Sequence, residues 1–169
     1  MNFLSRFVLK LKTTLVEQLK QGVSPEKLAQ SVATGAVIGL FPIIGPTTVM
    51  CAVSGVVLKL NHVAVQSVHY ALYPIQIALI IPYIKMGEWL SGRPEVSLNL
   101  QEMLAQFREN FLLAIQKYAS LGLLAIFAWA ISAPFVFYLV RFLSKPFFSK
   151  VLASLQERNK KVVPNSDHQ

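Results

Sequence analysis

The sequence predicts an all-α fold, an integral membrane helical bundle. Of its 169 residues, 54% are hydrophobic and only 14% are charged, and the mean hydropathy is +0.51. A soluble domain carries about 25% charged residues. Too few charges remain here to cover a water-facing surface, so lipid must cover much of it. Long apolar runs separated by short polar turns, with the basic residues gathered at the two ends of the chain, point the same way.

Residues 1–22 are predicted to form a basic amphipathic interfacial helix. Its apolar side chains recur at helical spacing, with Lys and Gln on the other face. These side chains are Leu4, Phe7, Val8, Leu11, Leu15 and Leu19. Such a helix suits the cytoplasmic surface of a membrane; the alternative is a helix packed on the protein's own core. No cleavable signal peptide is apparent, because Lys and Arg interrupt this segment throughout.

The membrane core is predicted over residues 23–92 and opens with Ser24-Pro25-Glu26, a helix start with Ser as N-cap. The uncharged run 28–58 that follows is predicted to be a broken, re-entrant helical hairpin. Pro42 ends its first half, because the ring removes a donor and restricts the preceding residue. Gly45-Pro46 restarts a helix. The run exceeds the ~20 residues of one crossing but is too short for two. A single kinked spanning helix is the alternative.

Small residues line one face of each half of this hairpin. They let membrane helices approach closely, and the predicted packing residues are Ser31, Gly35, Gly39 and Gly55. Irregular backbone at membrane depth needs the shelter of such contacts or a water-filled cavity. We therefore expect tight protein contact around the break.

A polar-striped membrane helix is predicted over residues 62–84. Polar residues spaced four, three, four and three apart fall on one helix face: His62, Gln66, His69, Tyr73 and Gln76. Because unpaired amides in hydrocarbon are costly, this stripe must face a partner or a cavity. Interhelical bonding and a substrate path both explain it. His69 is either a structural histidine or a group that exchanges protons near neutral pH.

The remainder is divided into three segments. Residues 93–117 form an amphipathic connector, expected at the membrane interface. Residues 118–143 contain a conventional transmembrane helix over 118–140. Residues 144–169 form a basic, partly disordered tail.

Charge counting predicts the topology. Five Lys or Arg residues precede residue 28 and six follow residue 140. The positive-inside rule places both ends in the cytoplasm. Crossings at 62–84 and 118–140 satisfy this rule if the hairpin does not cross, whereas a kinked spanning helix would put one basic end outside. The expected partners are the lipid bilayer and its anionic headgroups, together with a second copy or another membrane protein, and not nucleic acid.

The sequence lacks the usual catalytic motifs. It contains no GxxxxGK[ST], no HExxH, no paired cysteines and no convincing Ser-His-Asp arrangement. No carboxylate lies between Leu28 and Ile84, which argues against an acid–base enzyme or a cation pump. We predict no enzyme, no cofactor and no metal site. The single cysteine, Cys51, is interpreted as a packing residue.

The helix that restarts at Gly45-Pro46 offers free amide groups and a partial positive charge, which suit an anion such as a phosphate headgroup. Alternatively, its threonines simply fold the turn. The candidate substrate-binding residues are Pro42, Gly45, Pro46, Thr47, Thr48, Gln66, His69, Tyr73 and Gln76. The first hypothesis is a transporter or translocase of an anionic lipid or small anion. The second is a non-transporting scaffold or accessory subunit that binds another membrane protein through its small-residue faces.

A combination of motifs over residues 24–90 carries a family resemblance. They are Ser24-Pro25-Glu26-Lys27-Leu28-Ala29, then Gly35-x-x-x-Gly39-x-x-Pro42-x-x-Gly45, then Leu60-Asn61, and a later proline turn leading to Gly87. In this combination the chain resembles the DUF2062 family of small bacterial membrane proteins. This chain has Tyr73-Pro74 where the family has an Asn-Pro turn, so no role of that asparagine is carried over. The resemblance implies a location in the bacterial inner membrane.

Overall fold

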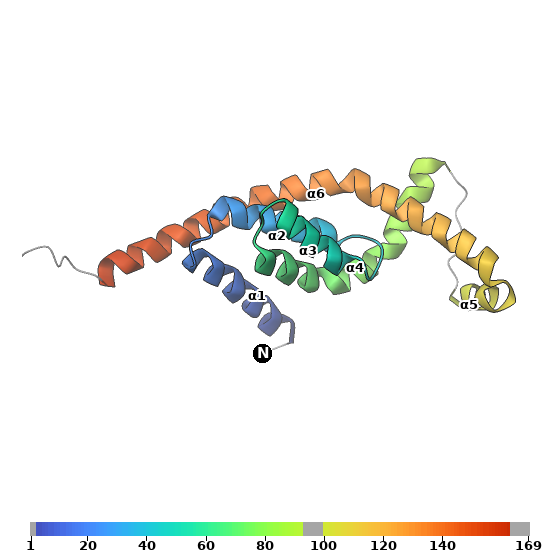
Figure 1. The fold of residues 1–169 in the computed structure, drawn as a ribbon, viewed down its shortest axis with the longest axis horizontal. Coiled ribbons are helices and arrows are strands. Elements are labelled where there is room, and N and C mark those ends of the chain that lie inside the picture. The colour runs from blue at the N-terminus through green and yellow to red at the C-terminus, as the bar shows by residue number, and fades with distance from the viewer. Residues whose placement is uncertain (1–2, 93–99, 163–169) are drawn as a thin grey trace, which may run out of the picture.

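The computed structural model describes residues 3–92 and 100–162, and these form six helices and no strand. The helices are α1 (Phe3–Lys20), α2 (Pro25–Gly39), α3 (Thr47–Val57), α4 (His62–Ser91), α5 (Leu100–Glu109) and α6 (Phe111–Val162). Helices α2 and α4 pack on each other and on the long α6, with α1 against one end of this group and α5 at the far end (Figure 1). The predicted all-α class is confirmed.

Helix α2 begins as the sequence predicts. The Oγ of Ser24 accepts a hydrogen bond of 3.3 Å from the Lys27 amide, and Pro25 is the first helical residue. The helix ends at Gly39, and α3 starts at Thr47, so Pro46 precedes the helix instead of opening it. Between them Gly45 has a φ of +115°, which glycine adopts without the steric cost that other residues meet. The predicted break in the apolar run is therefore present over residues 40–46.

Helices α2 and α3 double back on each other. The Nζ of Lys27, near the start of α2, donates a 3.4 Å hydrogen bond to the carbonyl of Leu58, directly after α3. The apolar run thus starts and ends at one end of the hairpin, which we call its base, and the break lies at the other end, which we call its tip. This arrangement is the hairpin and not the single kinked helix.

The two long helices extend beyond their predicted bounds. Helix α4 continues to Ser91 and α6 covers 111–162, where the sequence predicted 62–84 and 118–140. Each contains two prolines in its interior, so the proline turn expected before Gly87 is not formed. An interior proline removes one hydrogen bond and bends a helix, but packed neighbours keep the helix continuous. Residues 144–162 of the predicted tail are accordingly helical, and residues 163–169 lie outside the described chain.

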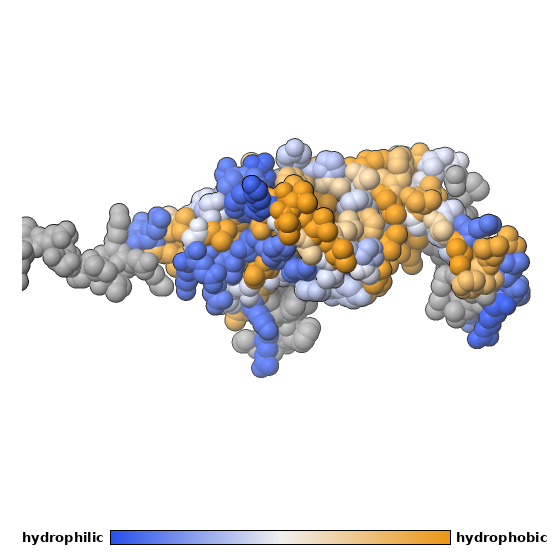
Figure 2. Space-filling model, in the orientation of Figure 1, coloured by the Kyte–Doolittle hydropathy of each residue, from blue (hydrophilic) through white to orange (hydrophobic). Residues whose placement is uncertain are grey.

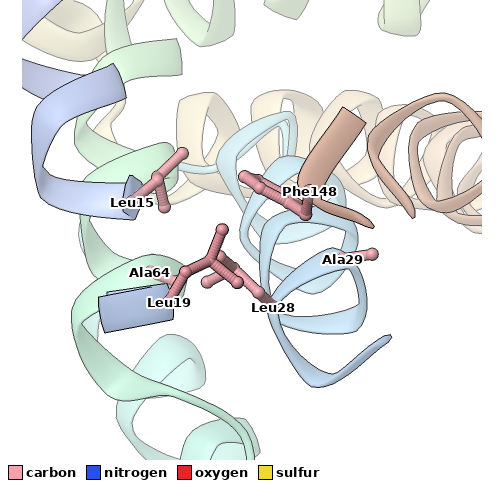
Figure 3. Packing of buried hydrophobic residues seen from close by; sticks show 6 residues of the cluster. All are labelled: Leu15, Leu19, Leu28, Ala29, Ala64 and Phe148. Atoms are coloured by element: carbon pink, nitrogen blue, oxygen red, sulfur yellow. The ribbon is translucent and has the colours of Figure 1, made fainter. Parts of the chain in front are cut away.

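Helix α1 packs on the core through its second half. Its Leu15 and Leu19 are buried with Leu28, Ala29, Ala64 and Phe148, which come from α2, α4 and α6 (Figure 3). This packing matches the alternative of a helix held on the protein's own core. The chain reverses direction after α1 at Gly22, where φ is +89° and the amide of Val23 donates to the Gln18 carbonyl. The side chains of Leu4, Phe7 and Val8 are outside the described part.

Two of the described helices, α4 and α6, are long and apolar enough to cross a membrane. In the most apolar window of α6 only 11% is buried against the protein, and large side chains such as Phe127, Ile131 and Phe135 are exposed. Figure 2 shows apolar residues over the middle of the molecule and hydrophilic residues around α1. So much exposed apolar surface indicates membrane association.

Candidate functional site

Glycines bring the hairpin against α4. A Cβ on Gly35 would lie 2.5 Å from the Val65 carbonyl oxygen, and one on Gly39 would lie 3.3 Å from the His69 Cα. A Cβ on Gly55 would meet the His62 ring at 2.5 Å. These close approaches use the residues that the sequence singled out for packing, and they set the break beside the polar stripe of α4.

The base of the hairpin is closed by a network of hydrogen bonds. The Ser31 Oγ donates to the Lys27 carbonyl at 2.7 Å and accepts the Asn61 amide at 2.9 Å. The Asn61 side chain donates to Gln18 Oε1 and accepts the Ala64 amide, both at 2.8 Å. Asn61 thus caps α4 and ties it to α1, while Ser31 ties it to α2.

At the tip, two glutamines of the stripe hold the break and the start of α3. The Gln76 Nε2 donates to the carbonyls of Phe41 and Ile43, at 2.8 and 3.3 Å, and its side chain is fully buried. The Gln66 Nε2 donates to the Thr48 carbonyl at 3.4 Å. Gln76 therefore bonds the break to α4, and Gln66 bonds the first turn of α3 to α4, which is the interhelical role that the sequence left open.

Helix α6 supports the same end of α2. The indole Nε1 of Trp129 donates to the Val37 carbonyl at 3.0 Å, and its ring meets Phe41 edge-on with 4.9 Å between centroids. Trp129 of α6 thereby holds both α2 and Phe41 of the break, although it lies more than eighty residues further along the chain.

A cleft of about 400 Å³ lies between the break and α4. It is lined by Ile44, Gly45, Thr47, Thr48, His69, Tyr70 and Tyr73. Five of the nine predicted substrate-binding residues therefore line one cleft, although they come from separate segments. Of the other four, Gln66 bonds the first turn of α3, Gln76 bonds the break, Pro42 is buried within the break, and Pro46 is exposed before α3.

The cleft contains polar groups that the described chain does not satisfy. Pro46 supplies no side-chain cap, and the first intrahelical bond of α3 comes from the Met50 amide, so the amides of Thr47, Thr48 and Val49 have no helical acceptor. The His69 side chain is 1% exposed, and its Nδ1 has no hydrogen-bond partner within the described residues. Buried polar groups are normally paired, so these groups are the candidates in the cleft for hydrogen bonds to a ligand.

A charged cluster that the sequence analysis did not find joins α2 to α6. The guanidinium of Arg141 contacts Glu26 Oε1 at 2.5 Å through Nη2 and 3.0 Å through Nε, and Lys145 Nζ lies 2.8 Å from Oε2. Hydrogen bonds from Lys145 and Arg141 lower the pKa of Glu26 to about 2. The i, i+4 spacing of the two cations was the available signal, since it places them on one helix face.

Comparisons with known proteins give a family and no relative of known activity. No curated protein and no solved structure matches the chain. A family model matches residues 10–153, described as an uncharacterized protein conserved in bacteria (DUF2062). This match extends the resemblance seen over residues 24–90 to α1 and to most of α6. The chain therefore belongs to the DUF2062 family.

Proposed function

We propose that this protein is a transporter or translocase that passes an anionic group, either the phosphate of a lipid headgroup or a small free anion, through the cleft at the hairpin tip. One observation carries the proposal: the uncapped start of α3 lines the same cleft as His69, whose buried Nδ1 has no partner within the described residues. Membrane transporters use broken helices in this way, with half-helix ends directed at the substrate.

The chemistry of the cleft suits an anion that must also leave. The free amides at the start of α3 and the positive end of its dipole attract negative charge. The hydroxyls of Thr47, Thr48 and Tyr73 add donors, and His69 adds a ring nitrogen. No Lys or Arg lines the described cleft, so a bound anion is held by neutral donors. Binding that is favourable but weak permits release on the other side.

The proposal includes a topology in the bacterial inner membrane. Helices α4 and α6 cross the bilayer, the α2–α3 hairpin enters it and returns, and both termini are cytoplasmic. Single cysteines at positions 2, 98 and 165, in a Cys51→Ala background, should label from the inside, the outside and the inside. Any other order would remove the two-crossing arrangement.

Flux in liposomes tests the function. We expect the purified protein to move either a fluorescent anionic phospholipid between leaflets or inorganic phosphate into the lumen, and the two probes distinguish the two sources of the anion. Thr47→Val combined with His69→Leu should lower the flux about tenfold or more. Tyr70→Phe is the matched control, because it keeps the aromatic wall of the same cleft. Absence of flux for both probes would refute transport.

The scaffold hypothesis now has to use a different surface. The faces of Gly35, Gly39 and Gly55 pack against α4 of the same chain and are not free for a partner. The exposed apolar ridge of α3, which contains Val49, Val53, Val56 and Val57, is one surface that such a partner could use. A stoichiometric partner crosslinked to this ridge in native membranes, with full function retained in the Thr47→Val, His69→Leu variant, would favour the scaffold.

A further inference from the structure

An apolar groove runs between α2 and α6. Its lining includes Thr34, Val37, Trp129, Pro134, Phe137 and Tyr138, and its volume is about 460 Å³. Tyr138 also lines a second hollow of about 810 Å³, which contains Phe142, Arg141 and Lys145. The two hollows share Tyr138 and follow each other along one face of α6, so together they present apolar side chains at one end and cations at the other. We call the two hollows together the α6 groove.

The cationic end carries a surplus of positive charge. Arg141 and Lys145 line the second hollow and share the single carboxylate of Glu26. Lys27 follows Glu26 in α2, and its Nζ donates to the carbonyl of Leu58, a residue that lines the first hollow. Three cations against one carboxylate leave a net charge of +2. Arg141 presents five N–H donors, of which Glu26 occupies two. Lys145 presents three, of which Glu26 occupies one. Both cations remain partly exposed, at 35% and 56%.

The length of the groove matches one leaflet of a bilayer. Trp129 and Arg141 are twelve residues apart on one continuous helix, which corresponds to about 18 Å at 1.5 Å per residue. Half of a typical hydrocarbon core is about 15 Å. An acyl chain that lies along the apolar end would therefore bring its headgroup to the level of the cations.

We propose that the α6 groove binds one glycerophospholipid with an anionic headgroup, its phosphate at Arg141, Lys145 and Lys27 and an acyl chain along Trp129 and Phe137. The site is separate from the tip cleft and does not depend on transport. The bound lipid would join α2 to α6 on the cytoplasmic side, where Glu26 already links them. Charge selects the headgroup, and the apolar groove selects a lipid over a free anion.

Trp129 provides a direct readout, because the chain has one other tryptophan, Trp89, which is 79% exposed. In a Trp89→Phe background, phosphatidylglycerol with brominated acyl chains should quench Trp129 at about fivefold lower mole fraction than brominated phosphatidylcholine. Lys145→Gln or Lys27→Gln should each lower this preference severalfold, as expected for the loss of one cation near an anionic lipid. Lys150→Gln, on α6 but outside the groove lining, is the matched control and should leave it unchanged.

Glu26→Gln separates lipid binding from a purely structural role. It removes the competing carboxylate and should raise the preference for phosphatidylglycerol, whereas cations that serve only to pair with Glu26 would give no gain. The proposal is overturned if the two lipids quench equally, if Lys150→Gln loses as much preference as Lys145→Gln, or if Glu26→Gln gives no gain in preference. Liposome flux through the tip cleft is measured separately, and its absence leaves this test intact.

Discussion

The two ends of the α2–α3 hairpin treat their polar groups in opposite ways. At the base, the Ser31 hydroxyl and the Asn61 side chain each make two hydrogen bonds to neighbouring helices or to their own turn. At the tip, α3 starts without a side-chain cap and His69 Nδ1 is buried without a partner. Polar groups that only maintain a fold are normally satisfied within it. The base is therefore the end of the hairpin whose polar side chains are satisfied, whereas the tip keeps polar groups without a partner among the described residues.

The largest effect is expected from Gly35→Val, which should disrupt the hairpin as a whole. A Cβ at this position lies 2.5 Å from a backbone oxygen of α4, which cannot rotate away as a side chain would. We expect a loss of about 3 kcal/mol, at the upper end for overpacking. Thermal unfolding in detergent measures it. Gly122→Ala in α6, where a Cβ meets nothing within 4 Å, is the control and should not destabilise. Equal behaviour of the two variants would contradict the close packing.

Removing the hydrogen-bond network at the base should lower the free energy of unfolding by less than Gly35→Val does. Asn61→Ala deletes the cap of α4 and leaves the buried Gln18 without its bonded partner. We expect about 2 kcal/mol, from the lost cap and the unpaired amide together. Asn110 also caps a helix, through the Leu113 amide at 3.1 Å, but is exposed. Asn110→Ala should therefore cost about 1 kcal/mol. If Asn61→Ala lowers the free energy of unfolding no more than Asn110→Ala does, the hydrogen bond to Gln18 adds no stability beyond the helix cap.

The sequence predicted the base and the break better than it predicted the helix lengths. Local chemistry was sufficient for the start of α2 at Ser24-Pro25 and for the interruption near Pro42, because caps and prolines act within one or two turns. The polar stripe was also visible, since its spacing depends only on helical periodicity. The predicted helices 62–84 and 118–140 ended where the apolar runs meet Lys85 and Arg141, whereas α4 and α6 continue through these charged residues because helix length depends on tertiary packing as well as on hydropathy.

Contacts between distant segments could not be predicted in the same way. Helical spacing placed His69 and Tyr73 on one face, but only the fold shows that this face meets Thr47 across a cleft. The Glu26 cluster depends on a partner 115 residues away. Residues so far apart in the sequence follow no local spacing rule, so Glu26 was interpreted only through its own helix.

At the tip, Thr47→Val should separate stability from function. The Thr47 side chain is 2% exposed and makes no hydrogen bond within the described residues, so a methyl group in place of the hydroxyl removes no protein contact. We expect a stability change below about 1 kcal/mol. Gln76→Leu, by contrast, leaves two carbonyls of the break unpaired and should cost about 2 kcal/mol. Calorimetry of both variants beside their flux would sharpen the contrast, and a large unfolding effect of Thr47→Val would make that residue structural.

The smallest expected effect is the pH dependence of stability that arises from Glu26. Lys145 and Arg141 lower the pKa of Glu26 from 4.5 to about 2, so the folded state favours the ionised carboxylate. The stability from this cluster is fully present above pH 4.5 and is lost as the pH falls through about 2. Unfolding temperatures of the wild type and Glu26→Gln should therefore converge over that interval and differ by a constant amount above it. Because Glu26 is partly exposed, the difference should be small. It arises at the satisfied base, so it should leave anion binding at the tip unchanged; a parallel loss of binding in Glu26→Gln at neutral pH would show that the two ends of the hairpin are coupled.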